Sequence, residues 1–172
     1  MEQRKAAILA ELPRLRRYSR ALLRDPDAAD DLVQDCLERA LRRLDNWQTD
    51  ENPRRWLFTI MHNLFIDQTR RTRRRAEVVT LTLDDSEAVS APAEQHESIA
   101  TREIMDALQE IRPDRRAAIL LVGLEGFSYA EAATLLGVPA GTLMSRVSRG
   151  REELRGLLDD FSRRRVVKVV ER

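Results

Sequence analysis

The sequence has a single cysteine, few aromatic residues and no long apolar run. Cys36 is the lone cysteine among 172 residues, which excludes an intrachain disulfide framework and a cysteine-based zinc site. Aromatic residues make up 5% of the chain, and 6 Gly and 6 Pro leave little material for turns, so a β-sandwich or barrel is not expected. No stretch approaches the roughly 18 apolar residues of a membrane-spanning helix, and the amino terminus lacks the apolar core of a secretory signal. These absences predict a cytoplasmic protein with no membrane insertion.

Charged residues, in contrast, are abundant and segregated along the chain. They make up 34% of the sequence, yet the formal net charge is only +1. Arginines are concentrated at residues 70–75, and the acidic residues of 84–97 have no Lys or Arg between them. Positive charge returns at 146–155 and 163–165. The net charge is therefore close to zero because segments of opposite charge cancel. Such basic blocks suggest a polyanionic partner, and the alternative is a solvated face.

Apolar residues recur at helical spacing through most of the chain, which predicts an all-α fold. The period is lost over residues 76–97, a stretch that is acidic, rich in small residues and interrupted by Pro92. A short strand is conceivable at Val78–Leu83, but the composition favours a flexible linker. We therefore expect two small helical domains joined by a flexible acidic linker. The domains are expected at 1–75 and 98–162, the linker at 76–97 and a basic tail at 163–172.

Helix starts are well marked in the first domain. Apolar spacing over 5–23 predicts a first helix, and Asp25-Pro26 and Asn52-Pro53 are typical of the starts of a second and a third. Cys36 lies inside the apolar stripe of the second helix, which predicts a buried and unreactive thiol. The opposite face of that helix carries the polar residues Asp27, Asp30, Asp31, Gln34, Asp35 and Glu38.

Residues 128–147 have the pattern of a helix–turn–helix. Ser128 and Glu131 form a capping box that starts a short helix, and Gly137 suits the left-handed residue that ends it. The longer helix that follows can present its outer face to the major groove of duplex DNA, where arginine and hydroxyl side chains read base edges or phosphates. The alternative is an ordinary helical hairpin with a basic outer face. That outer face is expected to carry Met144, Ser145, Arg146, Ser148, Arg149 and Arg151.

Aromatic residues beside the arginine cluster suggest a second nucleic-acid surface. Trp47 lies in the polar loop 45–52, and Trp56 lies at the start of the third helix. Aromatic rings next to basic residues suit single-stranded nucleic acid, because bases stack on the rings. Taken alone, Trp56 is more simply explained as a core residue. Trp47 is harder to assign to the core, because a loop gives its ring little to pack on.

Two sets of motifs resemble an RNA polymerase sigma factor of the extracytoplasmic-function group. The first set is DAADDLVQD at 27–35 and PRRWLFTIMHNLFID at 53–67. The second is FSYAEAA at 127–133 and LGVPAGTLMSR at 136–146. Both sets stand in the family's order, with a linker between them, and the resemblance covers nearly the whole chain. The chain also lacks the long middle domain of housekeeping sigma factors, as this group does.

The resemblance implies partners and residue roles. The partners are core RNA polymerase (the clamp helices of its largest subunit and its flap) and promoter DNA. Whether a dedicated anti-sigma factor also binds does not follow from the sequence, and this partner stays open. The first domain would bind polymerase and open the −10 element, with loop 45–52 capturing a base, and the second would bind the −35 element as duplex. The implied polymerase-binding residues are Asp30, Asp31, Gln34 and Asp35. The implied −10 residues are Trp47, Trp56, Asn63, Arg70 and Arg71. The implied −35 residues are Thr142, Met144, Ser145, Arg146, Ser148 and Arg149.

Met144 departs from the family pattern, which often has Lys or Arg at this position. The departure weakens one phosphate or base contact, so no specific −35 sequence follows from the resemblance.

No catalytic constellation competes with this interpretation. His62 and His96 are isolated, and no Gly-rich phosphate loop or metal-ligand motif is present in the sequence. We therefore expect no enzyme activity, no metal and no cofactor. Two other classes stay open. One is a helix–turn–helix regulator that binds duplex DNA alone as a dimer, and the other is a helical anti-regulator or adaptor that binds no DNA.

Overall fold

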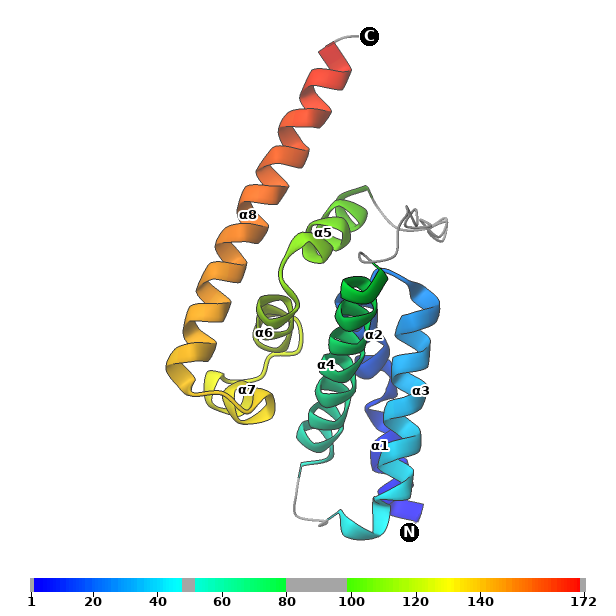
Figure 1. Cartoon of the computed structure of the whole chain (residues 1–172). Coiled ribbons are helices and arrows are strands. Elements are labelled where there is room, and N and C mark those ends of the chain that lie inside the picture. Colours follow the sequence, from blue (N-terminus) through cyan, green and yellow to red (C-terminus); the bar gives the residue numbers. More distant parts are fainter. Residues whose placement is uncertain (1, 48–51, 80–98, 171–172) are drawn as a thin grey trace. The chain divides into compact units, whose positions relative to one another are not determined.

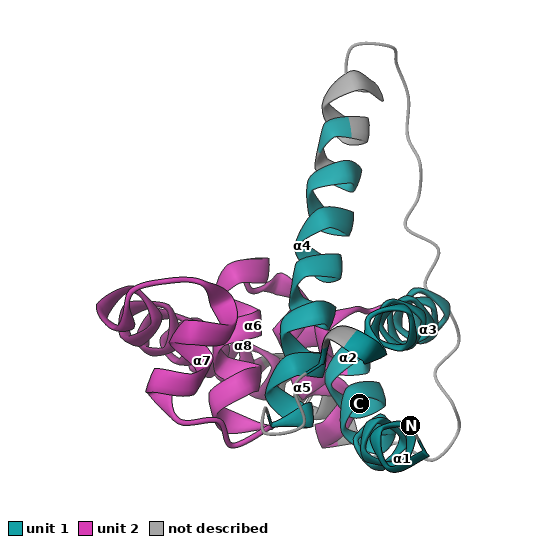
Figure 2. Ribbon diagram, turned by 90° about the horizontal axis from the view of Figure 1, so that it is seen from below, with its two compact units in different colours: residues 1–20, 25–92 teal, residues 21–24, 93–172 magenta. Residues whose placement is uncertain are grey.

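In the computed structural model, every regular element of the residues that it describes, 2–47, 52–79 and 99–170, is a helix (Figure 1). No strand occurs in these ranges, so the all-α expectation is confirmed. The chain forms two compact units, coloured separately in Figure 2. Unit 1 comprises 1–20 and 25–92, and unit 2 comprises 21–24 and 93–172. The helices are α1 (Glu2–Ala10), α2 (Leu12–Leu22), α3 (Pro26–Arg42), the 3-10 helix η1 (Leu44–Asn46), α4 (Pro53–Val79), α5 (Ile99–Glu110), α6 (Pro113–Gly123), α7 (Tyr129–Leu136) and α8 (Ala140–Val170).

The segment expected as one helix over 5–23 is instead two helices, which meet at Glu11. Pro13 explains the break, because proline has no backbone N–H and its ring clashes with the carbonyl four residues earlier. The Glu11 carbonyl accepts hydrogen bonds from the backbone N–H groups of Arg14 (3.1 Å) and Leu15 (3.0 Å), which start α2. The expectation of an uninterrupted helix is wrong here, although the spacing of its apolar residues is helical on both sides.

The other two predicted helix starts in unit 1 are confirmed. The backbone N–H of Asp27 donates to Asp25 Oδ1 at 3.1 Å, with Pro26 as the first residue of α3. In α4, the backbone N–H of Arg54 donates to Asn52 Oδ1 at 3.0 Å. Each cap satisfies an amide that has no partner inside its helix.

The core of unit 1 lies between α3 and α4, with α1 and α2 contributing from the side. Tyr18 and Phe58 pack with their ring centroids 5.1 Å apart. Cys36 is fully buried, and its thiol donates to the Leu57 carbonyl at 3.5 Å. Burial raises the pKa of the Cys36 thiol to about 12, so it stays protonated near neutral pH. The prediction of a buried thiol is confirmed.

Helix α4 is longer than the sequence suggests. The expected linker begins at 76, yet residues 76–79 continue α4 to Val79. Val78 and Val79 are therefore helical, and the short strand considered for this segment is wrong at both positions. The rest of the expected linker, 80–97, lies outside the described residues.

Unit 2 is built around α8, which packs on α5, α6 and α7. Leu121 of α6 and Leu143 of α8 are fully buried in this core. Gly150 allows α8 to approach α6 closely, because a Cβ at this position would stand 3.0 Å from Ile119 Cγ2. The basic tail expected at 163–172 is part of α8 as far as Val170.

Candidate functional site

Helices α7 and α8 form the helix–turn–helix that the sequence predicts. The backbone N–H of Glu131 donates to Ser128 Oγ at 3.2 Å, and the Ser128 N–H donates to Glu131 Oε2 at 2.9 Å, so the capping box is complete. Gly137 ends α7 with φ 63°, a left-handed conformation that favours glycine. The Val138 N–H then donates to the Ala133 carbonyl at 3.0 Å and closes the turn into α8. Local chemistry therefore fixes both ends of the turn.

The first turns of α8 present most of the predicted −35 residues to solvent. Leu143 and Val147 are buried, which orients the helix, whereas the opposite face is open. Met144 is 55% exposed. The other exposed members of the predicted set are Thr142, Ser145, Ser148 and Arg149.

Arg146 differs from these residues. Its guanidinium is half-buried and lies with Nε 3.6 Å from Oδ2 of Asp114, in the first turn of α6. Asp114 also pairs with Arg112 at 3.5 Å. The side chain of Arg146 is therefore directed toward α6, and its place among the base-reading residues stays a prediction. The sequence carries no local signal for this pair, since 32 positions separate the two residues along the chain.

The predicted −10 residues of α4 lie along one face of that helix. Trp56, Asn63 and Arg70 are seven residues apart, which is two helical turns. Asn63, Arg70 and Arg71 are exposed, and Trp56 is half-buried. The structure thus brings four of the five predicted −10 residues to one surface.

Trp47 behaves differently from its description in the sequence analysis. Its ring stacks on Trp56, with centroids 5.6 Å apart and planes at 13°, and it is only 4% exposed. The 3-10 helix η1 turns the chain back after α3, and the Trp47 N–H donates to the Leu44 carbonyl at 3.4 Å. The argument that the loop gives this ring little to pack on is wrong, because the first turn of α4 supplies a partner.

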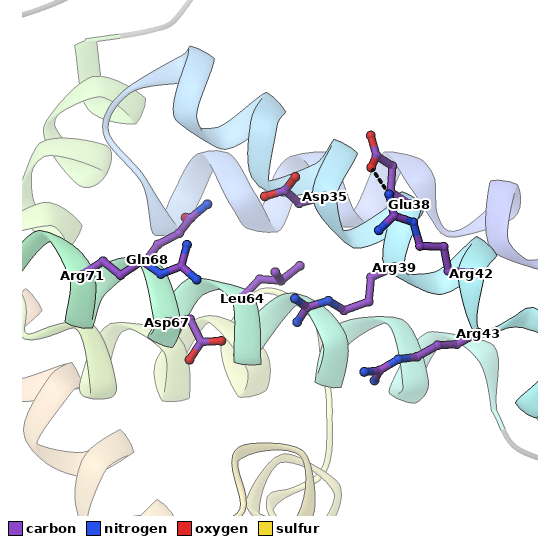
Figure 3. Close-up of a pocket in the computed structure, with 9 residues that line it drawn as sticks. All are labelled: Asp35, Glu38, Arg39, Arg42, Arg43, Leu64, Asp67, Gln68 and Arg71. Carbon is purple, nitrogen blue, oxygen red and sulfur yellow. Dashed lines mark ion pairs between the residues drawn. The ribbon is translucent and has the colours of Figure 1, made fainter.

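A groove runs between α3 and α4 in unit 1, with a volume of about 360 Å³ (Figure 3). Leu64 forms an apolar part of its lining, and Glu38 pairs with Arg42 at 3.5 Å on its α3 side. Asp35, predicted to bind polymerase, and Arg71, predicted to bind the −10 element, both line it. Sequence reasoning missed the other lining residues, which only the pairing of α3 with α4 brings together. They are Glu38, Arg39, Arg42, Arg43, Leu64, Asp67 and Gln68.

The remaining predicted polymerase-binding residues, Asp30, Asp31 and Gln34, are exposed on α3. The Gln34 amide donates to Glu38 Oε1 at 3.3 Å, one turn further along the same face. This polar face lies opposite the buried residues of α3, as the helical period predicts. We call Asp30, Asp31, Gln34 and Asp35 the acidic face.

Within the described ranges, no group of three or more His, Cys, Asp or Glu side chains is arranged to hold a metal ion. In the same part of the chain, no helix is long and apolar enough to cross a membrane. What the described surface offers is exposed charge and hydroxyl groups on helices, which suits recognition of macromolecules.

Comparisons with known proteins agree with this geometry. Residues 8–62 match the Sigma2 domain of PhyR family, and residues 101–154 match the Sigma-70, region 4 family. The chain is 41% identical over 153 residues to the ECF RNA polymerase sigma factor EcfG of Rhodopseudomonas palustris, covering 88% of this chain and 82% of EcfG. It is 30% identical over 149 residues to the RNA polymerase sigma factor CarQ of Myxococcus xanthus, covering 87% and 85% of the two chains.

A solved structure gives the same result for the fold. The sigma factor RpoE of Bartonella quintana, crystallised in complex with the anti-sigma factor NepR, superposes with a TM-score of 0.78 at 38% identity. The match covers 92% of this chain and 98% of RpoE. With a helix–turn–helix in unit 2, helical motifs in unit 1 and relatives along nearly its full length, the chain belongs to the ECF group of RNA polymerase sigma factors.

Proposed function

We propose that unit 1 of this chain binds core polymerase and the −10 element, while α8 of unit 2 reads the −35 element as duplex DNA. As an ECF sigma factor, the chain confers promoter-specific initiation on RNA polymerase and is an initiation factor rather than a catalyst. The finer assignment of the two elements is the proposal. The observation that carries it is the helix–turn–helix whose second helix exposes polar and basic side chains.

The exposed face of α8 supports −35 recognition. A recognition helix contacts base edges with its N-terminal residues, and Ser145, Ser148 and Arg149 lie in the first three turns of α8. Arg149 can donate two hydrogen bonds to guanine O6 and N7. Arg151 and Arg155, further along the helix, are exposed and suit phosphate contacts.

The face of α4 supports −10 recognition. Arg70 and Arg71 offer positive charge to a backbone, and Asn63 offers an amide that can donate to and accept from a base edge. The stacked pair Trp47 and Trp56 anchors one end of loop 45–52 on α4. We therefore assign Trp47 a supporting role under the base-capturing loop instead of direct stacking on a base.

The acidic face supports docking on polymerase. The apolar side of α3 and the cap at Asp25 hold this helix in the fold. The exposed side chains of Asp31 and Asp35 are therefore not needed for folding and can contact a partner. The proposed contact is with the clamp helices of the largest subunit, and the flap is proposed as a contact of unit 2.

An anti-sigma factor is a further proposed partner. The Bartonella quintana sigma factor, which matches 92% of this chain, was crystallised with the anti-sigma factor NepR. A related anti-sigma factor that covers the DNA- or polymerase-facing surfaces would keep this chain from assembling with polymerase.

In vitro transcription with core polymerase on a genomic library tests the proposal. We expect the chain with core to initiate at a defined set of promoters and the isolated chain to bind the same duplexes weakly in a gel-shift titration at physiological salt. Core polymerase alone is the control. Nanomolar, sequence-specific binding by the isolated chain would instead favour a dimeric helix–turn–helix regulator.

A further inference from the structure

Two exposed apolar side chains lie together on the outer side of the helix–turn–helix. Met144 is 55% exposed on α8, and Tyr129 is 36% exposed at the start of α7. Both line a hollow of about 540 Å³ within unit 2. Packing of α8 does not require Met144 to be apolar, because Leu143 and Val147 already anchor this helix in the core. The pair is therefore available to contact a partner of unit 2.

The surroundings of the hollow indicate the chemistry of that partner. Ser148, Arg151 and Arg155 line it from α8, at positions four, seven and eleven residues after Met144, which places all four on one helix face. Val147 and Glu152 complete the lining. Two arginines outnumber the single acid, so the rim favours an anionic partner. Because the lining lies on the predicted recognition helix, duplex DNA is the occupant for which we argue.

Among the four DNA bases, thymine alone presents an apolar group in the major groove, its C5-methyl. An apolar side chain on the base-reading turn of a recognition helix therefore has one base-borne partner of matching chemistry. Methionine suits this contact, because its unbranched and polarisable thioether adapts to an irregular surface.

We propose that Met144, with Tyr129 behind it, packs on the C5-methyl of a thymine in the −35 duplex and selects for thymine at that position. The inference rests on the proposed −35 role of α8 and goes beyond it by naming a base and an atom. Arg151 and Arg155 hold the flanking phosphates, so the apolar contact sets specificity and the cations set affinity.

The experiment compares thymine with deoxyuridine, which lacks only the methyl group. Holoenzyme made from the full chain and core polymerase first selects −35 sequences from a duplex library randomised in that region. Each thymine of the selected element is then replaced singly by deoxyuridine, and holoenzyme binding is measured by competition. Wild type, Met144→Ala, Met144→Leu and Leu124→Ala are compared. Leu124 is the matched control, because it is 38% exposed in unit 2 and does not line the hollow.

For the wild-type chain, we expect one thymine at which loss of the methyl weakens binding about fourfold, as expected for one buried methyl group. Met144→Ala should reduce this ratio to near one, while Met144→Leu and Leu124→Ala should keep it. The inference would be overturned if no thymine-to-deoxyuridine replacement weakened binding, or if Met144→Ala left the ratio of thymine to deoxyuridine binding unchanged. Either result would leave the proposed −35 recognition by α8 intact. Failure of wild-type holoenzyme to enrich any −35 sequence would instead overturn the proposed function. If Met144→Ala weakens assembly with core and leaves the thymine ratio unchanged, the hollow is a protein-binding surface and the inference is wrong.

Discussion

Trp47, directly after η1, stacks on Trp56 in the first turn of α4. Their rings lie 5.6 Å apart and nearly parallel, and Trp47 is almost completely buried. Stacked aromatic pairs contribute about 0.5–1.5 kcal/mol beyond the burial of their area. The pair therefore fixes one end of the proposed base-capturing loop, and its two possible roles, support and base stacking, can be separated by measurement.

We expect Trp47→Ala to destabilise the chain by about 3 kcal/mol, the cost typical of removing a large buried aromatic side chain. Trp47→Phe, which retains a ring against Trp56, should cost much less. Thermal and urea unfolding followed by circular dichroism measure both changes. Unchanged stability of Trp47→Ala, together with loss of promoter opening by holoenzyme, would show that Trp47 acts on DNA directly.

The contrast between Cys36 and Trp47 shows what the sequence can predict at the level of single residues. Cys36 follows a helical period, so its neighbours in space are three and four positions away and its burial can be inferred. Trp47 lies outside any helix, so no helical spacing of apolar residues predicts its neighbours. Its partner is known only once the chain is seen to turn back on α4, and sequence spacing does not encode that turn.

At the scale of elements, local signals predict the starts of α3, α4 and α7 and the end of α7, whereas the break at Pro13 was missed although its signal is also local. The cap at Asp25, the box of Ser128 with Glu131 and the left-handed Gly137 are all formed as the sequence indicates. Contacts between helices are not predicted, because nothing in the sequence of α8 indicates that Arg146 faces Asp114 of α6. The same holds for the groove between α3 and α4, whose lining comes from two helices.

The pair of Arg146 and Asp114 leads to a prediction about the orientation of α8. If Arg146 mainly sets that orientation, Arg146→Asp should weaken holoenzyme binding to all −35 sequences to a similar degree. The exchange of charges, Asp114→Arg with Arg146→Asp, should then restore part of the binding and stability. Ion pairs of this kind contribute about 0–1 kcal/mol, so the effect on unfolding is expected to be small.

Arg149→Ala is the matched comparison, because Arg149 is exposed on the same helix. Loss of a bidentate base contact should cost about 1–3 kcal/mol and relax discrimination at one base pair. Binding of holoenzyme to a panel of single-base −35 variants distinguishes the two patterns. A base-specific loss in Arg146→Asp that the charge exchange does not restore would return Arg146 to the base-reading set.

At the scale of the whole molecule, a net charge of +1 conceals surfaces of opposite sign. The acidic face exposes Asp30, Asp31 and Asp35 on α3, whereas the exposed arginines that we assign to DNA lie on α4 and α8. The two kinds of surface meet at the groove between α3 and α4, where Asp35 and Arg71 both line it. A protein partner on the acidic face and a polyanion on the arginines account for the opposite signs, since each surface attracts its own partner.

The acidic face gives the last prediction. Asp31→Ala with Asp35→Ala should leave folding intact, because changes at exposed positions usually alter stability by no more than about 0.5 kcal/mol each. The same pair should slow assembly with core polymerase, most clearly at low salt, because charges at the edge of an interface act first on the association rate. Melting followed by circular dichroism and a kinetic core-binding assay at two salt concentrations measure the two effects.

The control removes the same charge elsewhere. Glu110→Ala with Asp159→Ala takes two exposed carboxylates from unit 2 and changes the net charge equally. If the acidic face docks on polymerase, only the α3 pair slows assembly. If both pairs slow it alike, steering depends on total charge, and if neither does, α3 is a solvated flank whose acids have no part in binding. Only the first result ties a defined surface of this chain to polymerase, since family membership by itself does not say which residues would meet it.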